Sequence, residues 1–406
     1  MSEPSQPAVA SARERRKIFV LTWLAYGSYY LCRRPFAIAK NTLATTYHLD
    51  EHALGIIDTG YLVAYAAGQF ASGLLCDRVG ARRLVGVGML CVALTSVFFG
   101  MGSTAAVFAV AFSLNGLVQA TGWPGVVKAM TAMYEPTQRG TVMGWWATCY
   151  QVGGVAATAL ATFLLHHYGW RSAFFVPATL TAAVGVAFYL WLWEPPLSSA
   201  IERREASLAI AREPLVWCLG AAYFCIKLIR YCLTFWLPYI YEHHLHYSQS
   251  AAGYRSMSFD LGGVVGAILS GYLFDKTGKQ RGTLIVGLAL LLAVAFYFYP
   301  AVAALGAWPA FFGMVIIGFV LFGPDALVSS VAAQDLGGPA AAGTAAGFIN
   351  GVGSVGAILQ GSITAWVAQR YGWDAIFPTF AILSTGAALA VVPYAVSVGR
   401  DERVAP

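Results

Sequence analysis

The feature of this 406-residue chain that most restricts its fold is a series of twelve apolar segments. An α-helix needs about 20 predominantly apolar residues to cross the hydrocarbon core of a bilayer. Segments of about that length occupy residues 18–39, 54–75, 84–101, 105–129, 141–165, 172–193, 214–241, 252–274, 283–300, 308–333, 343–368 and 374–397. We therefore predict an all-α membrane protein with twelve transmembrane helices.

The composition excludes a soluble protein. Hydrophobic residues make up 58% of the chain and charged residues 11%, whereas soluble domains contain about 45–50% apolar and about 25% charged residues. The formal net charge is +6, but the basic residues gather in short loops between apolar segments, as in membrane proteins. We expect a lipid bilayer around the chain and no nucleic-acid partner.

A short motif repeats in the two halves of the chain. Asp77-Arg78-Val79-Gly80 follows the second apolar segment, and Asp275-Lys276-Thr277-Gly278 follows the eighth. A duplicated six-helix unit explains the repeat. We predict two pseudo-symmetric six-helix bundles, with a cytoplasmic N-terminus at 1–17, the N-terminal bundle at 18–193, a cytoplasmic linker at 194–213, the C-terminal bundle at 214–397 and a cytoplasmic tail at 398–406.

The distribution of Lys and Arg predicts the orientation. Positive residues concentrate in cytoplasmic loops, and most of those outside the apolar segments lie on the side of the N-terminus. Both termini are therefore expected in the cytoplasm. The sequence contains no Asn-x-Ser/Thr glycosylation site, which favours a multi-pass protein of a bacterial inner (plasma) membrane.

Two arginines lie deep inside apolar segments. Arg33 and Arg230 occupy equivalent places in the first and seventh segments. A charge near the bilayer centre costs about 2.5–3.5 kcal/mol on insertion scales, so each side chain should face an internal cavity. Guanidinium groups are permanently charged and bind oxyanions through two donors. The pair could therefore clamp a tetrahedral oxyanion; the alternative is two salt bridges that hold helices together.

The loops after the second and eighth segments resemble those of the major facilitator superfamily. The residues are GLLCDRVGARR from Gly73 and GYLFDKTGKQR from Gly271. The resemblance implies the major facilitator fold and a carrier whose substrate lies between the bundles near the middle of the membrane. We expect Asp77, Arg78, Asp275 and Lys276 to serve in gating and not in ligand binding.

Five segments resemble the organophosphate:phosphate antiporter family. They are AYGSYYLCRRPFAIAK, GYLVAYAAGQF, NGLVQATGWPGVV, KLIRYCLTFWLP and GTAAGFINGVGSVGA. The resemblance makes Arg33 and Arg230 the phosphate-binding pair and implies further substrate contacts from Tyr26, Tyr30, Tyr65, Lys227, Gln69 and Tyr150. For the tyrosines a place in the interfacial aromatic belt is the alternative. Gln69 and Tyr150 stand where glycerol-phosphate carriers have a lysine and a histidine.

Three acidic residues lie inside apolar segments: Asp58, Asp260 and Asp325. We expect them to pair with Lys227, Arg34 or nearby groups, or alternatively to carry a coupling proton. Phe235 replaces the aspartate that pairs with a basic residue at position 34 in the family resembled. We therefore hypothesise a salt bridge between Arg34 and Asp325 that latches the two halves; the alternative is that Asp325 pairs with Lys227 or is solvated.

No cofactor or metal site is expected. The seven histidines fall at the outer ends of the segments, and the seven cysteines form no CxxC pair. The Gly262-xxx-Gly266 and Gly347-xxx-Gly351 patterns predict closely packed helices.

We therefore predict a monomeric secondary transporter that exchanges a small anionic phosphorylated metabolite for inorganic phosphate. One alternative is a proton-coupled organic-anion symporter that uses Asp260 or Asp325. A second is a non-transporting sensor of a phosphorylated metabolite. We expect no enzymatic activity, because no nucleophile and base occur at helical spacing within the segments.

Overall fold

The computed structural model describes residues 11–131, 133–194, 200–243 and 249–400, and the described part contains α-helices, short 3₁₀ helices and one π-helix but no strand. The α-helices are α1 (Ala12–Leu31), α2 (Pro35–Tyr47), α3 (Glu51–Val79), α4 (Ala81–Gly100), α5 (Ala105–Gln119), α6 (Gly122–Thr131), α7 (Arg139–Tyr168), α8 (Ser172–Trp191), α9 (Ala200–Arg212), α10 (Pro214–His243), α11 (Gln249–Lys276), α12 (Arg281–Ala304), α13 (Ala307–Ala326), α14 (Ala332–Tyr371) and α15 (Ile376–Arg400). The π-helix is η2 (Leu327–Val331), and the 3₁₀ helices are η1 (Gly278–Gln280) and η3 (Trp373–Ala375).

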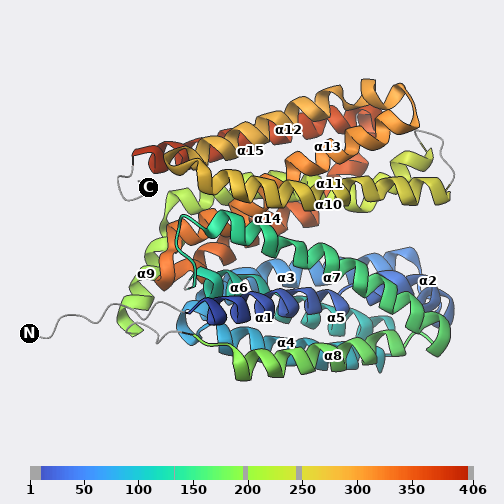
Figure 1. Cartoon of the computed structure of the whole chain (residues 1–406). Coiled ribbons are helices and arrows are strands. Elements are labelled where there is room, and N and C mark those ends of the chain that lie inside the picture. The colour runs from blue at the N-terminus through green and yellow to red at the C-terminus, as the bar shows by residue number, and fades with distance from the viewer. Residues whose placement is uncertain (1–10, 132, 195–199, 244–248, 401–406) are drawn as a thin grey trace, which may run out of the picture.

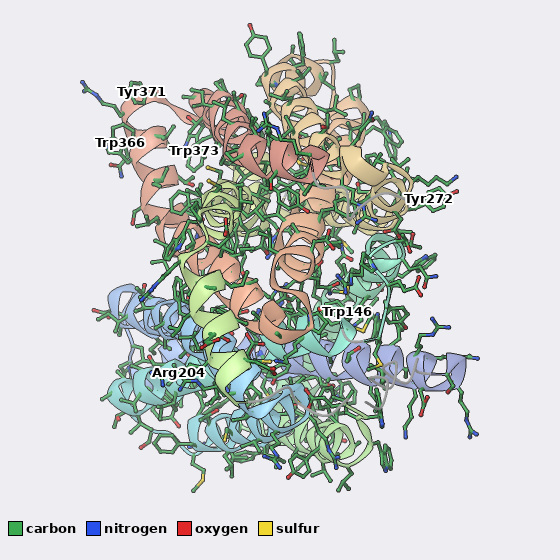
Figure 2. The ribbon with its side chains drawn as sticks, turned by 90° about the vertical axis from the view of Figure 1, so that its left-hand side faces the viewer. Trp146, Arg204, Tyr272, Trp366, Tyr371 and Trp373 are labelled. Atoms are coloured by element: carbon green, nitrogen blue, oxygen red, sulfur yellow. The ribbon has the colours of Figure 1, made fainter. Side chains whose placement is uncertain are left out.

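The helices form two bundles that lie side by side. Figure 1 shows α1–α8 below and α10–α15 above, with α3 and α7 facing α14 and α11 at the boundary. Helix α9 connects the bundles at the end of the molecule where α1 begins, which we call the α9 end. Figure 2 looks onto this end, where α9 and its Arg204 cross between the bundles.

Nine helices in the described part of the chain are long and apolar enough to cross a membrane. The longest stretch, Ala307–Tyr371, holds two of the expected segments, because Gly338 interrupts it with a φ of 53°. Two further expected segments are covered by α1 together with α2, and by α3. The predicted all-α membrane protein with two helical bundles and twelve crossings is therefore confirmed in the part of the chain that the structure describes.

Three crossings that the sequence predicts as continuous segments contain irregular turns. Helix α1 ends at Leu31, and the backbone N–H groups of Arg33 and Arg34 both donate to the carbonyl of Tyr30, at 3.1 Å. Pro35 then begins α2, since proline has no N–H to continue α1 but fits the first turn of a new helix. The fourth crossing is interrupted between α5 and α6, and the tenth passes through η2. All three interruptions lie near residues of the central site described below.

Glycines allow helices to approach closely within and between the bundles. A Cβ on Gly262 or Gly266 would collide with the backbone of Val315 or Phe319 on α13. At the boundary, a Cβ on Gly347 of α14 would lie 2.5 Å from a backbone oxygen of α3. The predicted close packing at both glycine patterns is therefore confirmed.

Candidate functional site

A small cavity lies between the two bundles and is lined by both. Its volume is about 20 Å³, which is room for about one water molecule. Most of the residues around it are basic or aromatic: Tyr26, Tyr30, Arg33, Tyr65, Trp123, Tyr150, Tyr223, Lys227, Arg230, Tyr231 and Asn350. The structure thus brings together nearly all the residues that the sequence singles out for substrate contact.

Gln69 is the exception among them. It lies one helical turn beyond Tyr65 on α3, is fully buried, and does not line the cavity. Neither atom of its side-chain amide has a hydrogen-bond partner in the described part of the chain. In this conformation Gln69 lies at the packed boundary between α3 and α14. A Cβ on Gly347 of α14 would lie 2.5 Å from the backbone oxygen of Gln69.

Arg33 is held by one amide and three aromatic rings. Its Nε donates to Oε1 of Gln119 at 2.9 Å. Its guanidinium carbon lies 4.8 Å from the ring centre of Tyr30, 5.0 Å from that of Tyr65 and 5.8 Å from that of Tyr61. Rings at these distances attract the cation and limit its movement.

A chain of hydrogen bonds fixes the amide that holds Arg33. Gln119 donates through Nε2 to Asn115 Oδ1 at 2.7 Å and accepts from the hydroxyl of Tyr61 at 3.0 Å. Asn115 in turn donates to Thr95 Oγ1 at 2.9 Å. The Gln119 oxygen is therefore directed at Arg33. This network was not predicted from the sequence, although two amides four residues apart in an apolar segment would have indicated it.

Arg230 is paired with a carboxylate of its own half. Its Nη1 donates to Asp325 Oδ2 at 2.6 Å. The hypothesised bridge between Arg34 and Asp325 is therefore wrong for this conformation. Arg34 follows the end of α1 and lies beside Gly154 on α7, while Asp325 faces α10 across the C-terminal bundle. No latch between the halves forms from this pair.

The other intramembrane acids also differ from the expectation. Asp58 pairs with Lys40 of α2, near the end of the molecule opposite α9, and not with Lys227 or Arg34. Asp260 is exposed on α11 and forms no ion pair within the described residues. Asp325 is therefore the one carboxylate that reaches a cation of the cavity in the part of the chain that the structure describes.

Lys227 lies in a neutral polar cradle. Its Nζ donates to Asn350 Oδ1 at 2.7 Å and to Ser354 Oγ at 2.8 Å. The residue is 2% exposed, and the rings of Tyr65 and Tyr223 lie 5.6 and 5.4 Å from Nζ. Within the described residues no carboxylate lies within ion-pair distance of it, so the cavity carries an excess of positive charge that suits an oxyanion.

The bundles close against each other at the α9 end. Asp77 is fully buried at the end of α3 and accepts from the backbone N–H groups of Thr344 at 2.7 Å and Gly343 at 3.2 Å, in the first turns after the break at Gly338. Lys128 also donates to it at 2.7 Å. A carboxylate at a helix N-terminus satisfies free N–H groups and the helix dipole.

The repeated motif makes the matching contact in the other half. Asp275 accepts from the backbone N–H groups of Gly140 at 2.7 Å and Thr141 at 2.6 Å, in the first turn of α7. The basic residues of the two motifs, by contrast, are exposed, and Lys276 lies over the ring of Tyr272 at the rim seen in Figure 2. The aspartates, and not Arg78 or Lys276, therefore join the two bundles.

A further charge cluster at this end was not predicted from the sequence. Asp335 lies 3.4 Å from Nη1 of Arg139 and 3.6 Å from Nη1 of Arg281, so it links α7 of one bundle to α12 of the other. Burial raises the pKa of Asp335, and the two guanidinium groups oppose that shift. No periodic signal marks such a residue, because it lies just beyond the end of an apolar segment.

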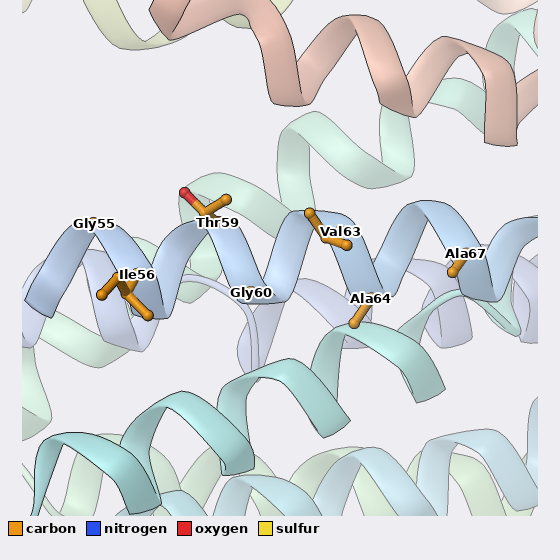
Figure 3. Close-up of a pocket in the computed structure, with 7 residues that line it drawn as sticks. All are labelled: Gly55, Ile56, Thr59, Gly60, Val63, Ala64 and Ala67. Atoms are coloured by element: carbon orange, nitrogen blue, oxygen red, sulfur yellow. The ribbon is translucent and has the colours of Figure 1, made fainter.

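The opposite end of α3 is uncovered. A groove of about 640 Å³ runs along this helix, where Ile56 and Val63 are 51% and 50% exposed. Figure 3 shows the residues that line it. The groove is lined by Gly55, Ile56, Thr59, Gly60, Val63, Ala64 and Ala67. Toward the α9 end the same helix packs tightly against α14, whereas in the described part of the chain no residue of the other bundle lines this groove.

Comparison with known proteins shows which family and which proteins this chain is similar to. Residues 18–361 match the family model of the Major Facilitator Superfamily. The chain is 29% identical over 414 residues to the "Probable hexose phosphate transport protein" of Chlamydia pneumoniae, with 93% of this chain and 90% of that protein covered. It is also 29% identical over 411 residues to the "Membrane sensor protein UhpC" of Escherichia coli, with 94% and 92% covered.

A solved structure supports the fold. The crystal structure of the human organic anion transporter MFSD10 superposes with a TM-score of 0.73 at 15% sequence identity, and the match covers 95% of this chain and 100% of that one. At this identity the likeness concerns the fold alone.

Proposed function

Because the chain belongs to the Major Facilitator Superfamily and, within it, to the organophosphate:phosphate antiporter family, we propose that it exchanges a phosphorylated small metabolite for inorganic phosphate by alternating access. Proteins of this superfamily are transporters and not enzymes. The observation that carries the proposal is the presence of Arg33 and Arg230, one from each bundle, in a single cavity at the bundle boundary.

In this mechanism the phosphoryl group binds between the two guanidinium groups. Arg33 keeps its terminal nitrogens for the ligand, because Gln119 engages its Nε. Arg230 uses Nη1 for Asp325 and can offer its remaining donors to a phosphate oxygen. An anion that bridges the two arginines neutralises both halves of the site and draws the bundles together.

The positive-inside rule identifies the α9 end with the cytoplasm in this proposal. The structure then corresponds to a carrier closed to the cytoplasm, with its Asp77 and Asp275 contacts formed. An empty carrier must pass its uncompensated Arg33 and Lys227 charges through an occluded state of low dielectric, which is costly. The carrier should therefore change its facing state only with an anion bound, which makes it an exchanger. A bacterial inner membrane is the proposed location.

The test uses purified protein in liposomes with labelled phosphate outside. We expect uptake when the lumen contains unlabelled phosphate and none when it is empty. Arg33→Lys and Arg230→Lys should each remove most of the uptake, because an ammonium replaces a planar fork of donors with a point charge. Arg171→Lys is the matched control: this arginine also lies over an aromatic ring, 4.6 Å from the centre of Trp170, but far from the cavity.

Two outcomes would contradict the proposal. Equal uptake into empty liposomes under a pH gradient would indicate a proton symporter. Saturable binding of a sugar phosphate without any transport would indicate a sensor, a candidate favoured by the similarity to the membrane sensor protein of Escherichia coli.

A further inference from the structure

The charges around the central cavity match one class of anion. Within the described residues its lining contains three cationic side chains, those of Arg33, Lys227 and Arg230, and Asp325 is the one carboxylate bonded to any of them. The formal charge of the site is therefore +2. The other intramembrane acids are not counted, since Asp58 pairs with Lys40 and Asp260, exposed on α11, neither lines the cavity nor pairs with one of its cations within the described residues.

Lys227 raises the formal charge of the site from +1 to +2. With Lys227 removed, Arg33, Arg230 and Asp325 would sum to +1, which suits a monoanion. With Lys227 present, the same site suits a dianion. The groups around Nζ are the rings of Tyr65, Tyr223 and Tyr231, the Arg230 guanidinium and neutral polar groups of α14. Asp325 is the carboxylate that acts on Nζ, but it is bonded to Arg230 and forms no ion pair with Lys227 within the described residues.

The hydrogen bonds of Lys227 leave it one free donor. The Ser354 hydroxyl donates its own proton to the carbonyl of Asn350, at 2.8 Å, so Ser354 Oγ accepts from Nζ. Asn350 Oδ1 takes a second N–H. An ammonium has three, and the third has no protein acceptor within the described residues. The cradle therefore fixes the position of the ammonium group at the wall of the cavity and keeps one donor for a ligand.

We propose that Lys227 sets the charge of the substrate, so that the site selects a doubly charged tetrahedral group, such as a phosphate monoester or hydrogen phosphate, over a singly charged group of the same shape. This inference rests on the proposed function and narrows its substrate class. Asp325 has the opposite effect, because it removes one positive charge from Arg230. Sulfate monoesters and phosphodiesters, which are monoanions, are then poor ligands.

The test compares methyl phosphate with methyl sulfate, which share a tetrahedral shape but carry charges of −2 and −1 above pH 7, since the second pKa of a phosphate monoester is about 6. Binding to the purified full chain is measured by calorimetry at pH 8. The wild type should prefer methyl phosphate by at least about tenfold, which is about 1.4 kcal/mol. Lys227→Gln should abolish most of that preference, whereas Lys227→Arg should keep it even if both affinities fall.

A double variant makes the charge count testable. Lys227→Gln combined with Asp325→Asn returns the site to +2, so the preference should recover to within about threefold of the wild type. Should the Asp325 variants fail to fold, the comparison of Lys227→Gln with Lys227→Arg decides the matter alone. Lys40→Gln, which neutralises a lysine outside the cavity, should leave the preference unchanged.

The failures are distinguishable. If the wild type binds methyl phosphate no better than methyl sulfate, or if Lys227→Gln weakens both ligands equally, the charge-selection role is wrong while phosphate exchange stands. If the wild type binds neither ligand, both this inference and the proposed function are overturned.

Discussion

Replacing Asp77 by Asn should open the boundary at the α9 end. The buried carboxylate accepts from the backbone N–H groups of Gly343 and Thr344 across the bundle boundary. A hydrogen bond to a charged group contributes about 1.5–3 kcal/mol. Asn keeps one acceptor oxygen but turns an N–H group toward the other donor. We therefore expect the closed state to lose about 3 kcal/mol, a shift of roughly 100-fold in the conformational equilibrium.

The ion pair with Lys128 does not enter this equilibrium. Lys128 lies on α6, in the same bundle as Asp77 on α3, so its contact persists in every conformation that keeps the bundle intact. Losing it should instead lower the melting temperature, because Lys128 is 5% exposed and would be left without its partner. The two effects of one substitution are thus separable by separate measurements.

The native residue Cys76 reports on the opening. It is fully buried beside Asp77, and a Cβ added at Gly343 of the other bundle would lie 2.8 Å from its Cβ. In a variant that retains Cys76 as its one cysteine, maleimide should label it slowly in the parent and faster by up to about 100-fold with Asp77→Asn. Asp275→Asn should have the same direction of effect, since it makes the symmetry-related contact.

Asp50→Asn is the matched control, because Asp50 also accepts from an N–H at a helix N-terminus, that of Ala53 at 2.8 Å, but within one bundle. It should leave the labelling of Cys76 unchanged. Labelling of the Asp77→Asn protein at the parental rate would refute the reasoning that these bonds hold the bundles closed.

Three further substitutions test other contacts. Gln119→Leu removes the acceptor that orients Arg33, so phosphate binding should weaken by about tenfold, measured by calorimetry; the melting temperature should also fall, because buried Tyr61 and Asn115 lose their partner. Unchanged affinity would show that the amide does not position the guanidinium. Gly347→Val places a Cβ 2.5 Å from a backbone oxygen of α3 and should abolish exchange in liposomes while leaving Cys76 open to maleimide, which continued exchange would contradict. Asp58→Asn breaks the partly exposed pair with Lys40 and should change stability by less than about 1 kcal/mol, and a larger loss in thermal unfolding would disprove that estimate.

The sequence predicted the crossings and the two arginines because both signals are one-dimensional. Apolar length alone defines a crossing, and a charge inside it stands out without any knowledge of neighbours. The duplication of the six-helix unit also indicated that Arg33 and Arg230 occupy equivalent positions in the two halves. These properties need no information about how one helix is rotated against another.

The pairing of charges could not be predicted in the same way. Whether Asp325 meets Arg230 or Arg34 depends on the rotation and depth of α13 against α10 and α1, and the irregular turns before Pro35 and around η2 change both. The sequence also hid the role of Gln119, because an amide in an apolar segment is equally compatible with structural hydrogen bonding. Such positions are determined by three-dimensional packing and not by spacing along the chain.

The small volume of the central cavity has a consequence for how ligand affinities should be interpreted. Space for one water molecule cannot admit a phosphoryl group, so the ligand binds to a conformation in which this cavity is wider. The apparent dissociation constant then equals the intrinsic constant divided by the fraction of molecules in that form. A substitution at Asp77, which never touches the ligand, can thereby alter the measured affinity as much as one at Arg33. Titration curves of distant variants would report the population of a hidden conformer rather than the strength of any contact.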